Sequence, residues 1–179
     1  MLSHYKMDGI MVSRILKLSV LSFIAFSVSA KAEDAHVHGE AVLEVVIDEA
    51  GALLGFEAPA IDIVGFEYLP KTDEEQQAID AKIAILGDMS NVVVLPDAAG
   101  CTLVDVHVDF EAEKHDGEVE HIAFHAEYEL DCADVSALTS LQATVFDQFP
   151  ALEEMEVEVV SPAGQKGAHL EPDRTKLEL

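Results

Sequence analysis

The feature that most constrains the fold is a long alternating segment bracketed by the only two cysteines, residues 101–132, "CTLVDVHVDFEAEKHDGEVEHIAFHAEYELDC". Apolar and polar residues alternate on both sides of a central "EKHDGE" turn. A period of two is typical of β-strands that bury one face. The segment therefore predicts an antiparallel hairpin with one apolar face and one face of acidic residues and histidines.

Pairing the apolar faces through Val108 and Phe124 places His107 opposite His125. Directly opposed residues have Cβ atoms about 4.5–5.5 Å apart, so the two imidazoles are close enough to share a cation. The same register brings the cysteines one residue out of line, so a disulfide between them requires a bulge or lies past the paired segment. A one-residue slip would destroy the histidine pair.

Carboxylates flank these histidines, because the same register places Asp105 opposite Glu127. Neutral imidazoles with carboxylates are ligands that suit Zn²⁺. The alternative is a solvent-exposed sheet face, on which the same side chains are hydrated and bind no metal. The pattern alone leaves both interpretations open.

Other segments extend the β-structure. Residues 41–48 alternate and return through 53–57, which predicts a first hairpin ending at Pro59. A helix is predicted from Thr72 to Leu86, because Thr72 and Glu75 have the spacing of a capping box and apolar residues recur every three or four positions. Residues 135–150 fit either a helix or a short strand. Further strands are expected at 155–160 and in the last dozen residues.

We therefore expect an α+β fold, with antiparallel hairpins and one main helix packed on them. Residues 33–179 are expected to form this single domain. The first 32 residues have the plan of a signal peptide, with basic residues, a short apolar run and the small residues of an A-x-A site at Ala30 and Ala32. The expected location is a bacterial periplasm, without a membrane anchor after cleavage.

Export to an oxidising compartment favours a disulfide between Cys101 and Cys132. A metal site using both cysteines is the alternative, although no C-x-x-C motif is present. The formal charge of −25 excludes nucleic acid and anionic membranes as expected partners, because an acidic surface repels both. The same charge attracts metal cations and basic protein surfaces.

His36 and His38 stand two apart just after the predicted signal peptide. In an extended chain their side chains project to the same side, roughly 6.6–6.8 Å apart along the backbone. They can chelate a metal only if the segment bends or a third ligand approaches from another strand. No nucleophile elbow, H-E-x-x-H motif or phosphate-binding glycine loop occurs, so an enzyme is not expected.

Several motifs occur here in the order found in one known family: "HVHGEAVLEVVID", "APAIDIVGFEYLPKTDEE", "LPDAAGC", "HAEYELDC", "FDQFP" and "GQKGAHLEP". With them the chain resembles the ZrgA-like zinc-binding periplasmic proteins over nearly all of its predicted mature length. The resemblance implies a secreted α+β domain that binds zinc and serves zinc acquisition, storage or transfer to an uptake system.

The family's H-x-H-G motif falls on His36, His38 and Gly39, and its G-F-E motif ends at Glu67. The resemblance thus implies these histidines and Glu67 as ligands, and it also implies the cysteine pair. Family members often carry a long loop rich in His, Asp and Glu in the second hairpin. Here the loop is only "EAEKHDGEVEH", so any site must use His36 and His38 or the face of His107 and His125.

The expected function is that of a periplasmic zinc buffer or metallochaperone, with zinc and a zinc-uptake component as partners. The acidic field enriches cations near such a site. The alternative is an acidic interaction module that docks a basic partner without functional metal.

Overall fold

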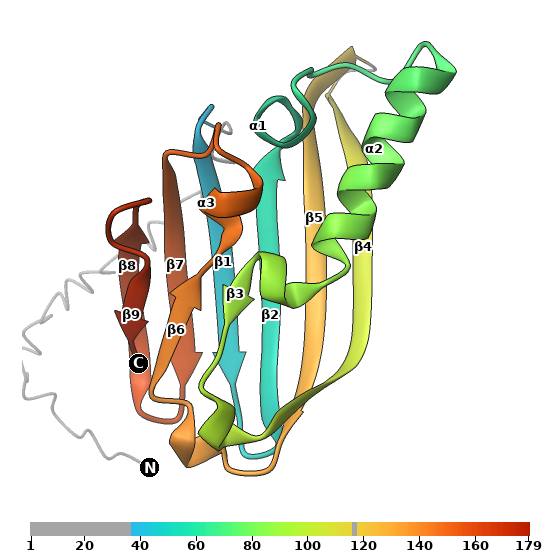
Figure 1. The fold of residues 1–179 in the computed structure, drawn as a ribbon. Helices are drawn as coiled ribbons and strands as arrows, with labels where there is room; N and C mark the ends of the chain where they lie inside the picture. Colours follow the sequence, from blue (N-terminus) through green and yellow to red (C-terminus); the bar gives the residue numbers. More distant parts are fainter. Residues whose placement is uncertain (1–36, 116–117) are drawn as a thin grey trace, which may run out of the picture. The chain divides into compact units, whose positions relative to one another are not determined.

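A six-stranded sheet forms the larger layer of the fold (Figure 1). The computed structural model describes residues 37–115 and 118–179, the side chains of 113–120 excepted. The strand order is β4 (Cys101–His115), β5 (Glu118–Cys132), β2 (Gly51–Pro59), β1 (Glu40–Ile47), β7 (Glu154–Ser161) and β8 (Gly164–Leu170). Neighbouring strands are antiparallel, except that β1 and β7 run parallel.

Each central strand buries every second residue, as its alternating sequence requires. In β1 the buried side chains include Leu43 and Val45, and they pack with Phe56 of β2, Tyr128 of β5 and Val157 of β7. The intervening residues face the opposite side of the sheet and are largely charged. We call that side the outer face.

Short helices and a second, small sheet cover the buried side. The helices are α1 (Ala60–Val64), α2 (Asp73–Leu86) and α3 (Val145–Gln148), with single 3₁₀ turns at Met89–Asn91, Asp97–Ala99 and Val135–Ala137. The small sheet has the order β3 (Val93–Val94), β6 (Ser140–Ala143) and β9 (Lys176–Glu178). Figure 1 shows α2 lying in front of β4 and β5, and β3 and β6 in front of the central strands.

The prediction of the longest helix is confirmed at both ends. The Thr72 hydroxyl accepts a hydrogen bond from the Glu75 backbone N–H, and the Glu75 carboxylate accepts one from the Thr72 backbone N–H, which completes the capping box. At the other end, the buried Tyr128 hydroxyl donates to the Leu86 carbonyl at 2.7 Å. This bond ties the helix to the sheet and satisfies a carbonyl that the helix leaves unpaired.

The predicted α+β class is wrong, because the fold is β-rich. The described residues contain nine strands in two sheets, and α2 is the one helix with more than five residues. Residues 135–150 fitted either a helix or a short strand, and Ser140–Ala143 within them form strand β6, so the strand content was underestimated. No helix in residues 37–115 and 118–179 has the length and apolar character needed to cross a membrane.

Residues Asp34–Leu179 cluster as one compact unit, and the fold described here belongs to it. The predicted signal peptide lies outside the described residues. The division of the chain into residues 1–32 and 33–179 stays a prediction.

The cysteine-bracketed hairpin is present, but its predicted register is wrong by two residues. Phe110, rather than Val108, pairs with Phe124. A shift between Leu103 and Asp105 then realigns the strands. The predicted disulfide is confirmed, since Cys101 and Cys132 are paired and bonded.

Candidate metal centre

The turn before β1 holds His38 in place. Gly39 has φ of +86°, a left-handed conformation that residues with a Cβ adopt only with strain. Its backbone N–H donates to the Asp62 carboxylate at 2.8 Å, so a side chain on α1 anchors the turn. The next N–H, that of Glu40, donates to the Val37 carbonyl and closes the turn.

A second left-handed glycine brings Glu67 to the same place. Gly65, with φ of +89°, ends α1 and directs the chain back toward β1. As a result His38 Nε2 lies 3.2 Å from Glu67 Oε2. The His38 side chain is 63% exposed and that of Glu67 is 30% exposed, so an ion from solvent can reach both.

This separation suits a shared zinc ion as well as a hydrogen bond. Zn–N and Zn–O bonds of about 2.0–2.2 Å at a tetrahedral angle place two ligand atoms about 3.4 Å apart. His38 and Glu67 thus form half of a tetrahedral ligand set. The other predicted ligand of this segment, His36, lies outside the described residues.

A pocket of about 560 Å³ opens beside His38. Its lining is dominated by carboxylates, which come from β1, the start of β7 with the residue before it, and the segment after β8: Glu40, Glu153, Glu154, Glu171 and Asp173. Closely spaced carboxylates in a concave site raise the local concentration of cations. The pocket therefore concentrates cations next to the His38 imidazole.

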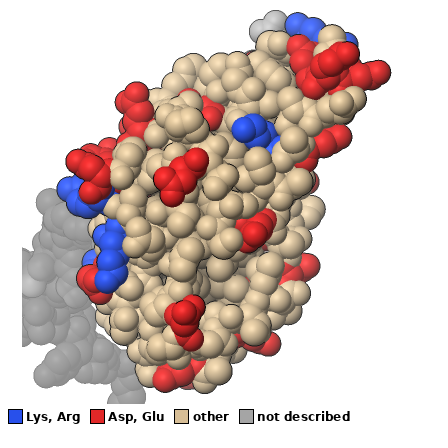
Figure 2. Space-filling model, viewed as in Figure 1, with Lys and Arg blue, Asp and Glu red and all other residues tan. Residues whose placement is uncertain are grey.

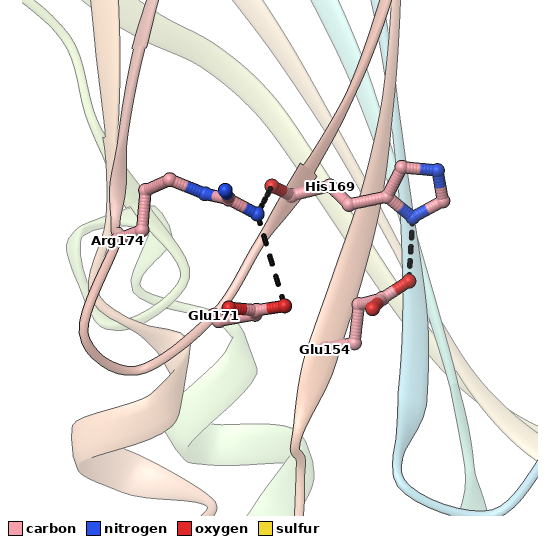
Figure 3. Close-up of polar contacts among 4 residues, drawn as sticks. All are labelled: Glu154, His169, Glu171 and Arg174. Atoms are coloured by element: carbon pink, nitrogen blue, oxygen red, sulfur yellow. Dashed lines mark hydrogen bonds and ion pairs between the residues drawn. The ribbon is translucent and has the colours of Figure 1, made fainter.

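Two polar pairs organise the rim of this pocket (Figure 3). Glu154 Oε1 lies 2.5 Å from His169 Nδ1, and this hydrogen bond, together with the carboxylate charge, raises the pKa of His169 above its ordinary value. Arg174 donates to the His169 carbonyl at 3.1 Å and lies 3.7 Å from the Glu171 carboxylate. A histidine that holds its proton competes poorly for a metal ion, so His169 is a weaker ligand than its position implies.

Sequence reasoning missed both His169 and Glu154 as site residues. Their strands were expected from the alternation in "MEVEVVSP" and from "KGAHLEP", but the pairing that joins them was not visible. Asp62 was missed as well, since its role is to hold a backbone N–H of the turn. The motif "APAIDIVGFE" contained the only signal, because it carries both Asp62 and Glu67.

The histidines of the second hairpin lie on the outer face but are not opposed. His107 pairs with Glu127, and His125 pairs with Asp109, so the two imidazoles are diagonal neighbours. The predicted partner of Glu127, Asp105, instead pairs with Glu129. The predicted four-ligand arrangement is therefore wrong in its pairing, although all four residues share the face.

Other partners replace the predicted ones. His107 Nε2 lies 2.5 Å from Asp109 Oδ2 on the same strand. His125 Nδ1 lies 3.4 Å from Glu57 Oε2 of β2. This second separation again matches two ligands of one tetrahedral zinc, so the outer face offers another half-site.

Within the described part of the chain, no three His, Cys, Asp or Glu side chains are arranged to hold one metal ion. The cysteines are excluded as ligands because they form the disulfide. Of the two histidines in the hairpin loop, His115 has no described side chain and His121 has one that is partly buried. The described residues form four imidazole–carboxylate pairs, His38–Glu67, His107–Asp109, His125–Glu57 and His169–Glu154. Only His38–Glu67 and His125–Glu57 have the separation of two ligands on one zinc ion, and each needs further ligands from water, His36 or another molecule.

Comparison with known proteins supports the zinc assignment. No curated protein matches the chain. The family described as "ZrgA family zinc uptake protein" matches residues 35–179, which include His36, His38, Glu67 and both cysteines. The chain therefore belongs to the ZrgA family of zinc uptake proteins.

Proposed function

We propose that the protein captures Zn²⁺ at the turn before β1 and acts as a zinc buffer or metallochaperone for uptake. The observation that carries the proposal is the 3.2 Å separation of His38 Nε2 and Glu67 Oε2. Membership of a zinc uptake family supports zinc as the ion. His36, two residues before His38, is the proposed third ligand.

Exposure of the pair favours transfer rather than permanent storage. Structural zinc sites are closed by four protein ligands, whereas an open position admits water or an incoming ligand. Since His38 is 63% exposed, a ligand from an acceptor protein can join the ion before His38 leaves it. The acidic pocket beside His38 keeps the local zinc concentration high between transfers.

The pH dependence follows from the imidazole ligands. A protonated imidazole cannot bind a metal ion, and an unperturbed histidine titrates near pH 6.5. Zinc affinity should therefore fall as the pH drops through the range in which histidines gain protons. In a compartment that acidifies, such a protein would release its zinc.

Calorimetric titration of the purified protein with zinc tests the proposal. His38→Ala and Glu67→Gln should each weaken zinc binding by tenfold or more, because each removes one of two described ligands. Glu74→Gln is the matched control, since it removes an exposed carboxylate from the start of α2. If zinc affinity is unchanged in His38→Ala and is lost in His125→Ala, zinc binds on the outer face and not at the turn before β1.

A further inference from the structure

The outer face of the six-stranded sheet is strongly acidic. Alternation along each strand directs carboxylates of β4, β5, β2, β1 and β7 to this one side. They include Asp105, Asp109, Glu127, Glu129, Glu57, Glu40, Glu44, Glu154, Glu156 and Glu158. Among lysines and arginines with described side chains, only Lys166 lies on this sheet. It pairs with Val159, whose side chain is on the buried side, so Lys166 is not part of the outer face.

Several of these carboxylates are placed side by side. Register pairs Glu44 with Glu158 across β1 and β7, and Asp105 with Glu129 across β4 and β5. In the part of the chain described, none of these four carboxylates makes an ion pair with a lysine or arginine. Like charges in neighbouring positions destabilise a sheet, so the fold carries an uncompensated repulsion here.

An exposed apolar row crosses the same face near the ends of β1 and β7 and the start of β2. Val46 of β1 pairs with Leu53 of β2 on one side and with Val160 of β7 on the other. Their exposures are 45%, 50% and 43%, so three large apolar side chains form one contiguous strip in water. Apolar side chains next to charged ones are the usual composition of a protein–protein interface.

The opposite side of the molecule does not share this character. Figure 2 shows the side that carries the helices, where the carboxylates over the centre are scattered among wide uncharged areas and others gather at the upper right and left edges. Most of the side chains covering the sheet there are apolar or neutral. The negative charge of the protein is therefore distributed unevenly, and the outer face receives a concentrated share.

We propose that the outer face docks a protein that presents lysines and arginines beside an apolar patch. Such a partner neutralises the paired glutamates and covers the strip of Val46, Leu53 and Val160. A second copy of this chain is disfavoured, because two outer faces would repel each other. Anionic membranes and nucleic acids are disfavoured for the same reason.

The size of the face fits this role. Six strands about 4.8 Å apart, each about eight residues long at about 3.3 Å per residue, give an area on the order of 600–700 Å². Stable interfaces bury roughly 800 Å² on each partner. The outer face is thus large enough to supply most of one interface without any part of the proposed zinc turn.

The test uses a peptide of twelve residues that alternates lysine and leucine, titrated into the ¹⁵N-labelled protein in zinc-free buffer. Amide shifts should cluster at residues 42–46, 53–57 and 156–160. The double variant Glu44→Gln/Glu158→Gln should weaken peptide binding about tenfold. The double variant Glu74→Gln/Asp147→Asn, which removes two exposed carboxylates from helices on the other side, should leave binding within twofold.

Amide shifts spread equally over α2 and the outer face would overturn the proposal, and so would equal weakening of peptide binding in both double variants. Either result would mean that the peptide responds to the net charge of the protein and not to the outer face. Concentration-dependent dimerisation of the free protein through residues 42–46 would also overturn it, because the occupant would then be a second copy. Zinc binding is measured separately, so failure here leaves the zinc proposal standing.

Discussion

His38 Nε2 lies 3.2 Å from Glu67 Oε2, although 29 residues separate them in the chain. Two left-handed glycines create this proximity, one in the turn before β1 and one at the end of α1. The candidate metal centre is thus formed by backbone geometry at two glycines. This dependence can be tested without altering a ligand.

Gly65→Ala should lower the free energy of unfolding by about 1–2 kcal/mol, since φ of +89° strains a residue with a Cβ. Zinc affinity should fall with it, because Glu67 follows directly. Gly55→Ala in β2 is the control: its φ is not left-handed and the nearest atoms to the new Cβ are 4.0 Å away. Urea denaturation of both variants measures the difference, and equal stabilities would show that the turn is not strained.

Glu44→Gln/Glu158→Gln should raise the free energy of unfolding by about 0.2–1 kcal/mol, because the variant removes a like-charge pair from neighbouring strands. The gain should shrink at high ionic strength, since salt screens exposed charges. Thermal unfolding at low and high salt measures both effects. Loss of stability in the variant would mean that these glutamates make a stabilising contact. If the variant is more stable and also binds the peptide more weakly, the paired glutamates of the outer face lower stability and serve binding.

The raised pKa of His169 predicts a defined pH window. Its folded-state pKa lies above the unfolded value, so the pair with Glu154 adds stability below about pH 6.5 and loses it as the pH rises through the folded pKa. In an NMR titration Glu154→Gln should return the His169 pKa toward its ordinary value, while Glu74→Gln should not. The stability deficit of Glu154→Gln should be larger at pH 6 than at pH 8. A deficit that does not change with pH would exclude a protonated His169 as its cause.

Cys101→Ala/Cys132→Ala should lower the free energy of unfolding by roughly 3–4 kcal/mol in the chain-entropy model, because the bond closes a loop between positions 31 residues apart. Reduction of the original protein should reproduce the loss, and reduction of the variant should change nothing further. A loss far below this range would indicate that β4 and β5 stay associated in the unfolded chain.

Local features of the fold were readable from the sequence. Alternation at residues 41–47 predicted which side chains of β1 are buried, and the capping box at Thr72 and Glu75 predicted where α2 begins. The hairpin register was wrong because a period-two pattern keeps the same face after any two-residue shift. The alternation therefore decides which residues share a face and leaves open which of them are opposed.

Long-range relationships were not readable. The parallel pairing of β1 with β7 joins segments more than a hundred residues apart, and nothing in either alternating pattern identifies the other strand. The acidic pocket depends on that pairing and was missed for this reason. The His169–Glu154 pair depends instead on the register of the β7–β8 hairpin, which the alternation leaves open. The proximity of His38 and Glu67 was expected only through the family resemblance, because it requires the exact path of the chain around α1.

The central claim is that zinc binds at His38 and Glu67, and anomalous diffraction at the zinc absorption edge from crystals grown with zinc tests it most directly. The account predicts an anomalous peak about 2.0–2.2 Å from both His38 Nε2 and a Glu67 carboxylate oxygen. A peak at His125 and Glu57 instead, with none near His38, would contradict it.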